Sequence, residues 1–218
     1  MTYMVRESAK LNLVISHRDD VDTSSWSQEQ FHAELKRLTT GMDPRVRRIV
    51  NLIKAPITNW PVYQVRNLPT WISESGKYVL MGDGAHAMAF YLSMGVSLAV
   101  EDAAALASAL ELHIKAPSQT SLPEAMQIFE EVRKPRAEAV RNASLHAGNM
   151  LHLGPGSQRD ARDQAAMNDG VYDEALRKGD PLTEWISYGI TDKTIRDWCY
   201  GYDVIETMKS LAARRKFL

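Results

Sequence analysis

The stretch Val79–Ile114, "VLMGDGAHAMAFYLSMGVSLAVEDAAALASALELHI", decides the fold of this chain. A short apolar run leads into Gly-Asp-Gly-Ala-His, a loop follows, and a long amphipathic segment begins near Gly95. A strand that passes through a glycine turn toward a helix is how chains build one wall of a nucleotide-cofactor site. The first question is therefore whether this chain still holds such a cofactor.

Composition limits the classes of function. The chain has 218 residues with 44% hydrophobic and 24% charged residues, which is ordinary for a globular protein. A formal net charge of -1 provides no field that would attract nucleic acid or an anionic membrane, so we expect small-molecule or protein partners. Cys199 is the only cysteine, which excludes an internal disulfide. We find no signal peptide and no apolar run long enough to span a membrane, and we predict a cytoplasmic protein.

The N-terminal part predicts a hairpin followed by helices. The runs "TYMVRES" and "LNLVISH" alternate like two antiparallel strands joined by a short turn. Ser25 or Ser27 can cap a helix through "SQEQFHAELKRLT", and Pro44 opens another helix that Pro56 closes. "NWPVYQV" (59–65) is typical of an edge strand because it contains Pro61.

The remainder predicts long helices on a small sheet. We expect residues 77–83 to form a buried strand, and the helix from Gly95 to bury an apolar stripe: Val96, Val100, Ala103, Ala107, Leu110 and Ile114. Ser121 and Glu124 form a capping box for a second long helix, which Pro135 should kink. The fold class is α+β, with a small, mostly antiparallel sheet packed with long helices. We expect one domain over 1–152 and a helical C-terminal extension over 153–218.

The central motif resembles a known family. The C-terminal half of FAD-dependent aromatic hydroxylases, the salicylate-hydroxylase-like FAD monooxygenases, carries a pattern close to G-D-A-A-H-P-x-x-P-x-x-x-Q-G, then E-D-A and a helix. Here the pattern stands as "GDGAHAMAFYLSMG" (82–95), followed by "EDA" (101–103). The similarity extends upstream through "LPTWISESGKYVL" and downstream through "FEEVRKPRAEAV", so it covers Thr2 to about Leu151.

This resemblance implies roles for particular positions. Asp83 matches the aspartate that binds the flavin ribityl chain, and the loop after His86 matches the segment that lies against the isoalloxazine ring. The amides near Gly95 match the helix start that faces the flavin. If FAD is bound, Asp83 and Gly95 would contact it.

Other features of the family are missing from this sequence. The family binds the pyrophosphate through a G-x-G-x-x-G turn in its N-terminal half, and no such motif occurs here; "LGPGS" (153–157) follows a helix rather than a strand. Ala87 and Phe90 stand at the two proline positions of the loop, and Met94 stands at the glutamine position. The resemblance therefore implies a truncated flavoprotein-monooxygenase-like fold, for which we expect no tight FAD binding.

Candidate site residues cluster around the loop. Asp83, His86 or Tyr91 could polarise a carbonyl by a hydrogen bond. An adaptable apolar pocket for a hydrophobic substrate could be lined by the neighbouring aromatic and methionine residues: Trp60, Tyr63, Met88, Phe90 and Met94.

Structural roles are the alternative for each of these residues. Asp83 could cap the following turn, His86 could be a half-buried histidine with satisfied hydrogen bonds, and the aromatic residues could form core. Glu101 and Asp102 are typical of carboxylates near a helix start, and Arg133 and Arg136 of partners for acidic neighbours. His146 and His152 do not share a helix face, so no metal site is expected.

Three hypotheses for function follow. The first is a flavin-independent enzyme of monooxygenase ancestry that catalyses cyclisation (including pericyclic cyclisation), isomerisation or dehydration of a small hydrophobic metabolite in natural-product biosynthesis. The second is a truncated or split FAD-dependent monooxygenase that hydroxylates an aromatic substrate, and the third is a non-catalytic binding or assembly subunit. The first is the preferred hypothesis. Unpaired edges at the hairpin and at residues 59–65 also predict a homodimer in which a second copy covers an open sheet edge.

Overall fold

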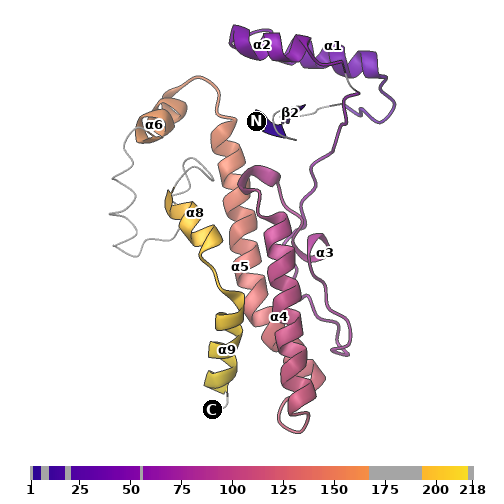
Figure 1. The fold of residues 1–218 in the computed structure, drawn as a ribbon, viewed down its shortest axis with the longest axis vertical. Coiled ribbons are helices and arrows are strands. Elements are labelled where there is room, and N and C mark those ends of the chain that lie inside the picture. The colour runs from indigo at the N-terminus through magenta and orange to yellow at the C-terminus, as the bar shows by residue number, and fades with distance from the viewer. Residues whose placement is uncertain (1, 6–9, 18–20, 55, 167–192, 216–218) are drawn as a thin grey trace. The chain divides into compact units, whose positions relative to one another are not determined.

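The computed structural model describes residues 2–5, 10–17, 21–54, 56–166 and 193–215. These residues are mostly helical, with one two-stranded antiparallel sheet, as Figure 1 shows. The chain divides into two compact units, Met1–Trp60 and Pro61–Leu218. Each unit is described by itself.

Unit 1 contains the hairpin and two short helices. Strands β1 (Thr2–Val5) and β2 (Lys10–Leu13) pair antiparallel, with Thr2 opposite Leu13, which confirms the predicted hairpin. Helix α1 (Gln28–Leu38) begins at the predicted cap Ser27, whose side chain and that of Gln30 form a capping box. The Asp43 side chain accepts from the Arg45 N–H at 2.8 Å and caps α2 (Pro44–Asn51).

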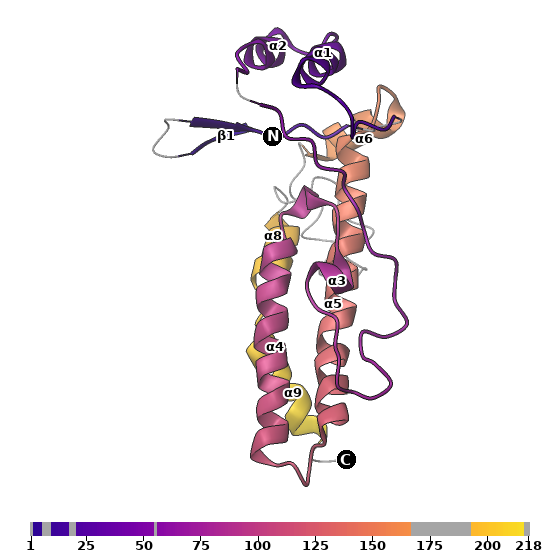
Figure 2. The ribbon, with the colours of Figure 1, turned by 90° about the vertical axis from the view of Figure 1, so that its right-hand side faces the viewer.

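Unit 2 is built on two long neighbouring helices. Its elements follow in the order α3 (Asp83–His86), the 3-10 helix η1 (Phe90–Leu92), α4 (Gly95–Lys115), α5 (Leu122–Leu151), α6 (Ser157–Ala166), α8 (Lys193–Tyr200) and α9 (Val204–Arg215). Helices α4 and α5 run side by side in opposite directions, and α9 packs against both (Figure 2). The capping box of Ser121 and Glu124 starts α5 as predicted, and α5 runs unbroken through Pro135. None of the described helices is long and apolar enough to cross a membrane.

The core of unit 2 lies between these helices. Its fully buried side chains include Leu98, Ala105 and Ala109 from α4. Facing them are Phe129, Ala137 and Val140 from α5, and Met208 from α9 completes the layer. The small alanine side chains in this core allow the two helix axes to pack closely.

The predicted apolar stripe of α4 is wrong. Val96 is 80% exposed, Val100 65% and Ile114 73%, and Ala103 and Ala107 are exposed as well. The buried face instead contains Leu98, Asp102, Ala105 and Ala109. The buried face can include the Asp102 carboxylate because Arg133 and His86, from other segments, form hydrogen bonds to it.

Two expected strands also differ from the structure. Residues 77–83 form only an isolated bridge between Ile72 and Val79, and Tyr78 is 76% exposed, so they are not a buried strand. Residues 59–65 are not a strand at all, although the Val65 N–H bonds the carbonyl of Ala87 at 3.1 Å. A buried strand needs neighbours on both sides, and the described residues provide residues 77–83 with only the segment around Ile72. The homodimer edge expected at 59–65 therefore does not exist.

Candidate functional site

The Gly82 turn is fixed by its backbone geometry. Gly82 has φ 56° and ψ −143°, a conformation that glycine adopts without steric cost. Its N–H donates to Asp102 Oδ2 at 2.8 Å, which attaches the start of α3 to α4. The carbonyl of Gly82 accepts from the N–H groups of Ala85 and His86. This turn therefore places Asp83 beside the N-terminal half of α4.

Asp102 is a buried acceptor on α4. Besides the hydrogen bond from the Gly82 N–H, its carboxylate accepts one from Arg133 Nε at 2.9 Å and forms one with His86 Nε2 at 2.7 Å. Asp102, His86 and Arg133 have no exposed area. Burial acts to raise the pKa of the Asp102 carboxyl, but the hydrogen bonds from His86, Gly82 and Arg133 outweigh it and hold the pKa below its ordinary value. Asp102 is thus a carboxylate that joins three segments of the chain.

Glu101 continues this network toward the C-terminal helices. Its carboxylate binds Arg133 at 2.6 Å and receives two bonds from Arg136, at 2.7 and 2.8 Å. The Arg136 guanidinium also donates to the Cys199 carbonyl at 2.9 Å and lies 3.9 Å from the centre of the Tyr202 ring. The expectation that Arg133 and Arg136 pair with acidic neighbours is confirmed. The two carboxylates pair with α5 rather than serving the start of their own helix.

Helix α5 also holds the loop that follows His86. Ser144 Oγ donates to the carbonyl of Ala89 and accepts from the Leu92 N–H at 3.3 Å. Arg141 donates to the Val65 carbonyl at 2.9 Å and to the side chain of Asn67. The loop is therefore fixed by hydrogen bonds to a helix, although the prolines of the family pattern are replaced.

Tyr91 forms a hydrogen-bonded pair at the end of α5. Its hydroxyl lies 3.0 Å from His152 Nε2, and its ring stacks on Phe90 with centroids 4.9 Å apart. The ring rests on Gly148, where a Cβ would come within 3.0 Å of three ring atoms. Phe90 is 41% exposed and Tyr91 is half-buried, so this pair is accessible from the surface.

The predicted site residues differ in burial. Asp83 is exposed and makes no cap bond to α3, whereas His86 lies in the interior beside Trp71, with ring centroids 5.6 Å apart. The five predicted pocket residues differ widely in exposure: Trp60 78%, Tyr63 76% and Phe90 41% exposed, Met88 half-buried and Met94 buried. Two surface grooves are described in unit 2, and neither contains any of these residues.

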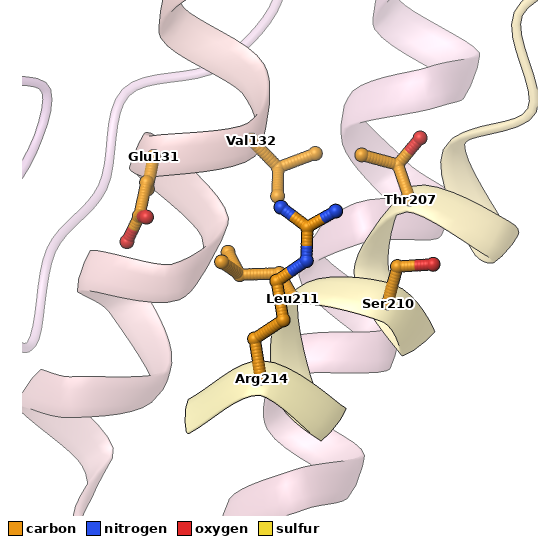
Figure 3. Close-up of a pocket in the computed structure, with 6 residues that line it drawn as sticks. All are labelled: Glu131, Val132, Thr207, Ser210, Leu211 and Arg214. Carbon is orange, nitrogen blue, oxygen red and sulfur yellow. The ribbon is translucent and has the colours of Figure 1, made fainter. Parts of the chain in front are cut away.

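The larger of these grooves lies between α5 and α9 (Figure 3). It is lined by Glu131, Val132, Thr207, Ser210, Leu211 and Arg214. Its volume of about 230 Å³ is below the 300–1,000 Å³ typical of small-molecule sites. This groove is far in sequence from the glycine motif and contains none of its residues.

The start of α4 offers backbone donors. Met94 precedes the helix, and no side chain caps its first turn. The first N–H groups of a helix lack intrahelical partners and carry the positive end of the macrodipole. Together with the exposed Asp83, they could hold an electron-rich oxygen and a hydroxyl-bearing chain. Gly95, which the resemblance assigns to this role, is the first residue of α4.

Several structurally important residues were not anticipated. Glu130 accepts from the Thr70 hydroxyl and the Trp71 N–H, and Arg141 and Ser144 fix the neighbouring segments. These residues share α5, but their partners lie 52 to 76 positions away in the sequence, so no local pattern reveals them. His152 was considered only as a metal ligand, whereas it pairs with Tyr91.

Unit 2 is thus a mostly helical unit that combines a glycine turn, two carboxylates bonded to arginines and a long helix whose start has no side-chain cap. The model of the FAD binding domain family matches residues 5–144, and the chain belongs to this family.

Two of the relatives are named as FAD-dependent monooxygenases and a third as a hydroxylase. The chain is 28% identical over 217 residues to FAD-dependent monooxygenase OpS4 of Beauveria bassiana (strain ARSEF 2860), covering 99% of this chain and 47% of that protein. It is 29% identical over 199 residues to FAD-dependent monooxygenase atnJ of Arthrinium sp, covering 89% and 46%. Salicylate hydroxylase of Pseudomonas putida is 29% identical over 160 residues, covering 70% and 36%. The chain thus spans at most about half the length of these relatives.

Proposed function

We propose that this chain forms the ring-facing part of an FAD-dependent monooxygenase, and that a segment outside these 218 residues binds the pyrophosphate. Two observations support the proposal: Asp83 is exposed at a turn fixed by the Gly82–Asp102 bond, and the start of α4 has no side-chain cap. The family match and the relatives support the choice of cofactor. The sequence contains no G-x-G-x-x-G turn, so these residues fit only one end of FAD.

Each part of the chain has a role in this proposal. Asp83 would accept hydrogen bonds from the ribityl hydroxyls, and the first N–H groups of α4 would donate to an electron-rich oxygen of the ring system. The loop 87–93, held by Ser144, would form a wall that limits access of water. FAD, when bound, would supply the oxygen chemistry.

A comparison of two flavins tests this proposal. Riboflavin has the ring and the ribityl chain without the adenosine diphosphate. Binding is measured by quenching of flavin fluorescence on titration with the purified chain. We expect weak binding, with Kd values for riboflavin and FAD within about threefold of each other, a difference of less than about 0.7 kcal/mol. Asp83→Asn should weaken the binding of both flavins. Asp160→Asn, which changes an exposed aspartate on α6, should leave the binding of both unchanged.

Two results would contradict the proposal. If FAD bound more than about 100-fold more tightly than riboflavin, the chain itself would grip the diphosphate, because this ratio corresponds to about 2.7 kcal/mol. If neither flavin bound at millimolar concentration, the chain would have no ring-facing site.

A cofactor-free cyclase or isomerase is the second candidate. The Tyr91–His152 pair supports it, since a tyrosine hydroxyl that bonds an imidazole at 3.0 Å next to an exposed ring can polarise a substrate carbonyl. His86 is buried, so it would act only by positioning the Gly82 turn. A colourless preparation that converts a hydrophobic polyene, and loses this activity in Tyr91→Phe, would favour this candidate over the first.

A further inference from the structure

Four charged side chains form a balanced group in the interior beside the Gly82 turn. Two neighbouring carboxylates of α4 bind two guanidiniums of α5, and we call these four residues the charge quartet: Glu101, Asp102, Arg133 and Arg136. The side chain of Glu101 is 13% exposed and that of Arg136 is 6% exposed, while the other two have no exposed area. Two negative and two positive charges cancel, which is the condition under which charged groups are tolerated in an interior.

Arg133 is shared between the two carboxylates of the quartet. Its Nε donates to Asp102 Oδ1 at 2.9 Å, and its Nη1 donates to Glu101 Oε2 at 2.6 Å. Both oxygens of Glu101 also accept from Arg136, at 2.7 and 2.8 Å. If Arg136 lost its charge, one negative charge in the interior would lack a partner. Arg133 would then serve two carboxylates alone, so its bond to Asp102 would weaken.

Asp102 in turn holds the segment that contains Asp83. Its Oδ2 accepts from the Gly82 N–H at 2.8 Å and forms a hydrogen bond with His86 Nε2 at 2.7 Å. The other ring nitrogen of His86 is buried and has no hydrogen-bond partner among the described residues, so the bond to Asp102 is the one by which these residues orient the ring. Asp83 lies between Gly82 and His86 in the sequence, and its position therefore depends on where the Asp102 carboxylate lies.

We propose that Arg136 is a positioning residue for the turn that contains Asp83, and that it acts by balancing the charge of the quartet. Arg136 is itself held by the C-terminal helices, because it donates to the Cys199 carbonyl near the end of α8 at 2.9 Å and lies 3.9 Å from the centre of the Tyr202 ring. Contacts with α8 and with the segment before α9 thus reach the turn through Glu101 and the rest of the quartet. The consequence for flavin binding rests on the proposed function, whereas the effect on the turn does not.

A cycle of charge-neutralising variants tests the inference. Arg136→Gln leaves an unpaired carboxylate, so it should speed amide hydrogen exchange at Gly82, measured by NMR without flavin, by at least about threefold, a typical effect between coupled residues. It should also raise the Kd of riboflavin by at least about threefold for the same reason. The double variant Glu101→Gln/Arg136→Gln removes the unpaired carboxylate as well. It should therefore bring the exchange rate and the Kd back toward the wild-type values, although it has fewer ion pairs than either single variant.

Arg215→Gln is the matched control. Arg215 also joins a C-terminal helix to α5, through Glu131, but it lies outside the quartet, so this variant should leave the exchange rate and the Kd unchanged. If Arg136→Gln does not fold, the same rescue is measured against Glu101→Gln alone, which leaves an unpaired arginine instead of an unpaired carboxylate.

Three results would overturn the inference. Unchanged exchange at Gly82 in Arg136→Gln would show that the turn does not depend on the charge balance. A double variant that is perturbed as much as the single one would show that Arg136 acts by packing rather than by charge. A riboflavin Kd that stays constant while the exchange rate rises would show that the turn does not position Asp83 for a flavin. If the wild type bound no riboflavin, the proposed function would fail, while the exchange rates would still decide whether Arg136 positions the turn.

Discussion

Replacing Asp102 by asparagine should destabilise unit 2 more than any surface change. The substitution keeps the size of the side chain but removes its negative charge. In the wild type this buried carboxylate forms hydrogen bonds with Gly82 N–H, His86 Nε2 and Arg133 Nε. Breaking a buried ion pair costs about 3–5 kcal/mol. Because Arg133 keeps its ion pair with Glu101 in the variant, we expect the free energy of unfolding to fall by about 3 kcal/mol, the lower end of this range. For a chain of this size, that corresponds to a fall in Tm of about 6–12 °C.

Urea unfolding followed by circular dichroism at 222 nm measures this effect. Glu111→Gln is the matched control, because Glu111 forms an exposed ion pair with Lys115 on the same helix. The urea midpoint of this variant should equal that of the wild type within error. A loss of less than about 1 kcal/mol in Asp102→Asn would refute the reasoning, since so small a loss is typical of a pair exposed to solvent.

The pH dependence of unfolding in the wild type and in Asp102→Asn gives a second test. The pKa of Asp102 is lowered in the folded chain, so its contribution to stability is present above the unfolded value of about 4 and is lost as the pH falls through the lower native value. The difference in unfolding free energy between wild type and Asp102→Asn should therefore be constant near neutral pH and should shrink below about pH 4. A difference that stayed unchanged in acid would contradict the assignment.

Three further outcomes are expected. Gly148→Ala should lower the Tm although alanine favours helices, because its Cβ would collide with the Tyr91 ring; a raised Tm would contradict this packing. Arg136→Ala should speed amide hydrogen exchange in 204–215, since it removes the contacts to Cys199 and Tyr202, and unchanged exchange would count against those contacts. Burial raises the pKa of the Cys199 thiol to about 11, so a disulfide reagent at pH 8 should react with it only in denaturant.

Local signals in the sequence predicted the elements that depend on nearby residues. The hairpin, the Ser27 and Ser121 capping boxes and the start of the helix at Gly95 all appear where expected, because each is fixed by residues within a few positions of one another. The family was also evident from the glycine motif, and its model matches the chain. The segment 167–192 of the expected C-terminal extension lies outside the described residues. The domain boundary near residue 152 stays a prediction, as do the homodimer and the cytoplasmic location.

The sequence by itself thus determined the helices, their caps and the family, since these follow from short-range periodicity and from a contiguous motif. Only the tertiary structure decided which face of α4 is buried. Hydrophobicity favoured the face of Val96 and Val100, but the interior face contains Asp102, because Arg133 and His86 from distant segments compensate its charge. Burial of a charge depends on partners in space, and the spacing of residues along one helix contains no information about them.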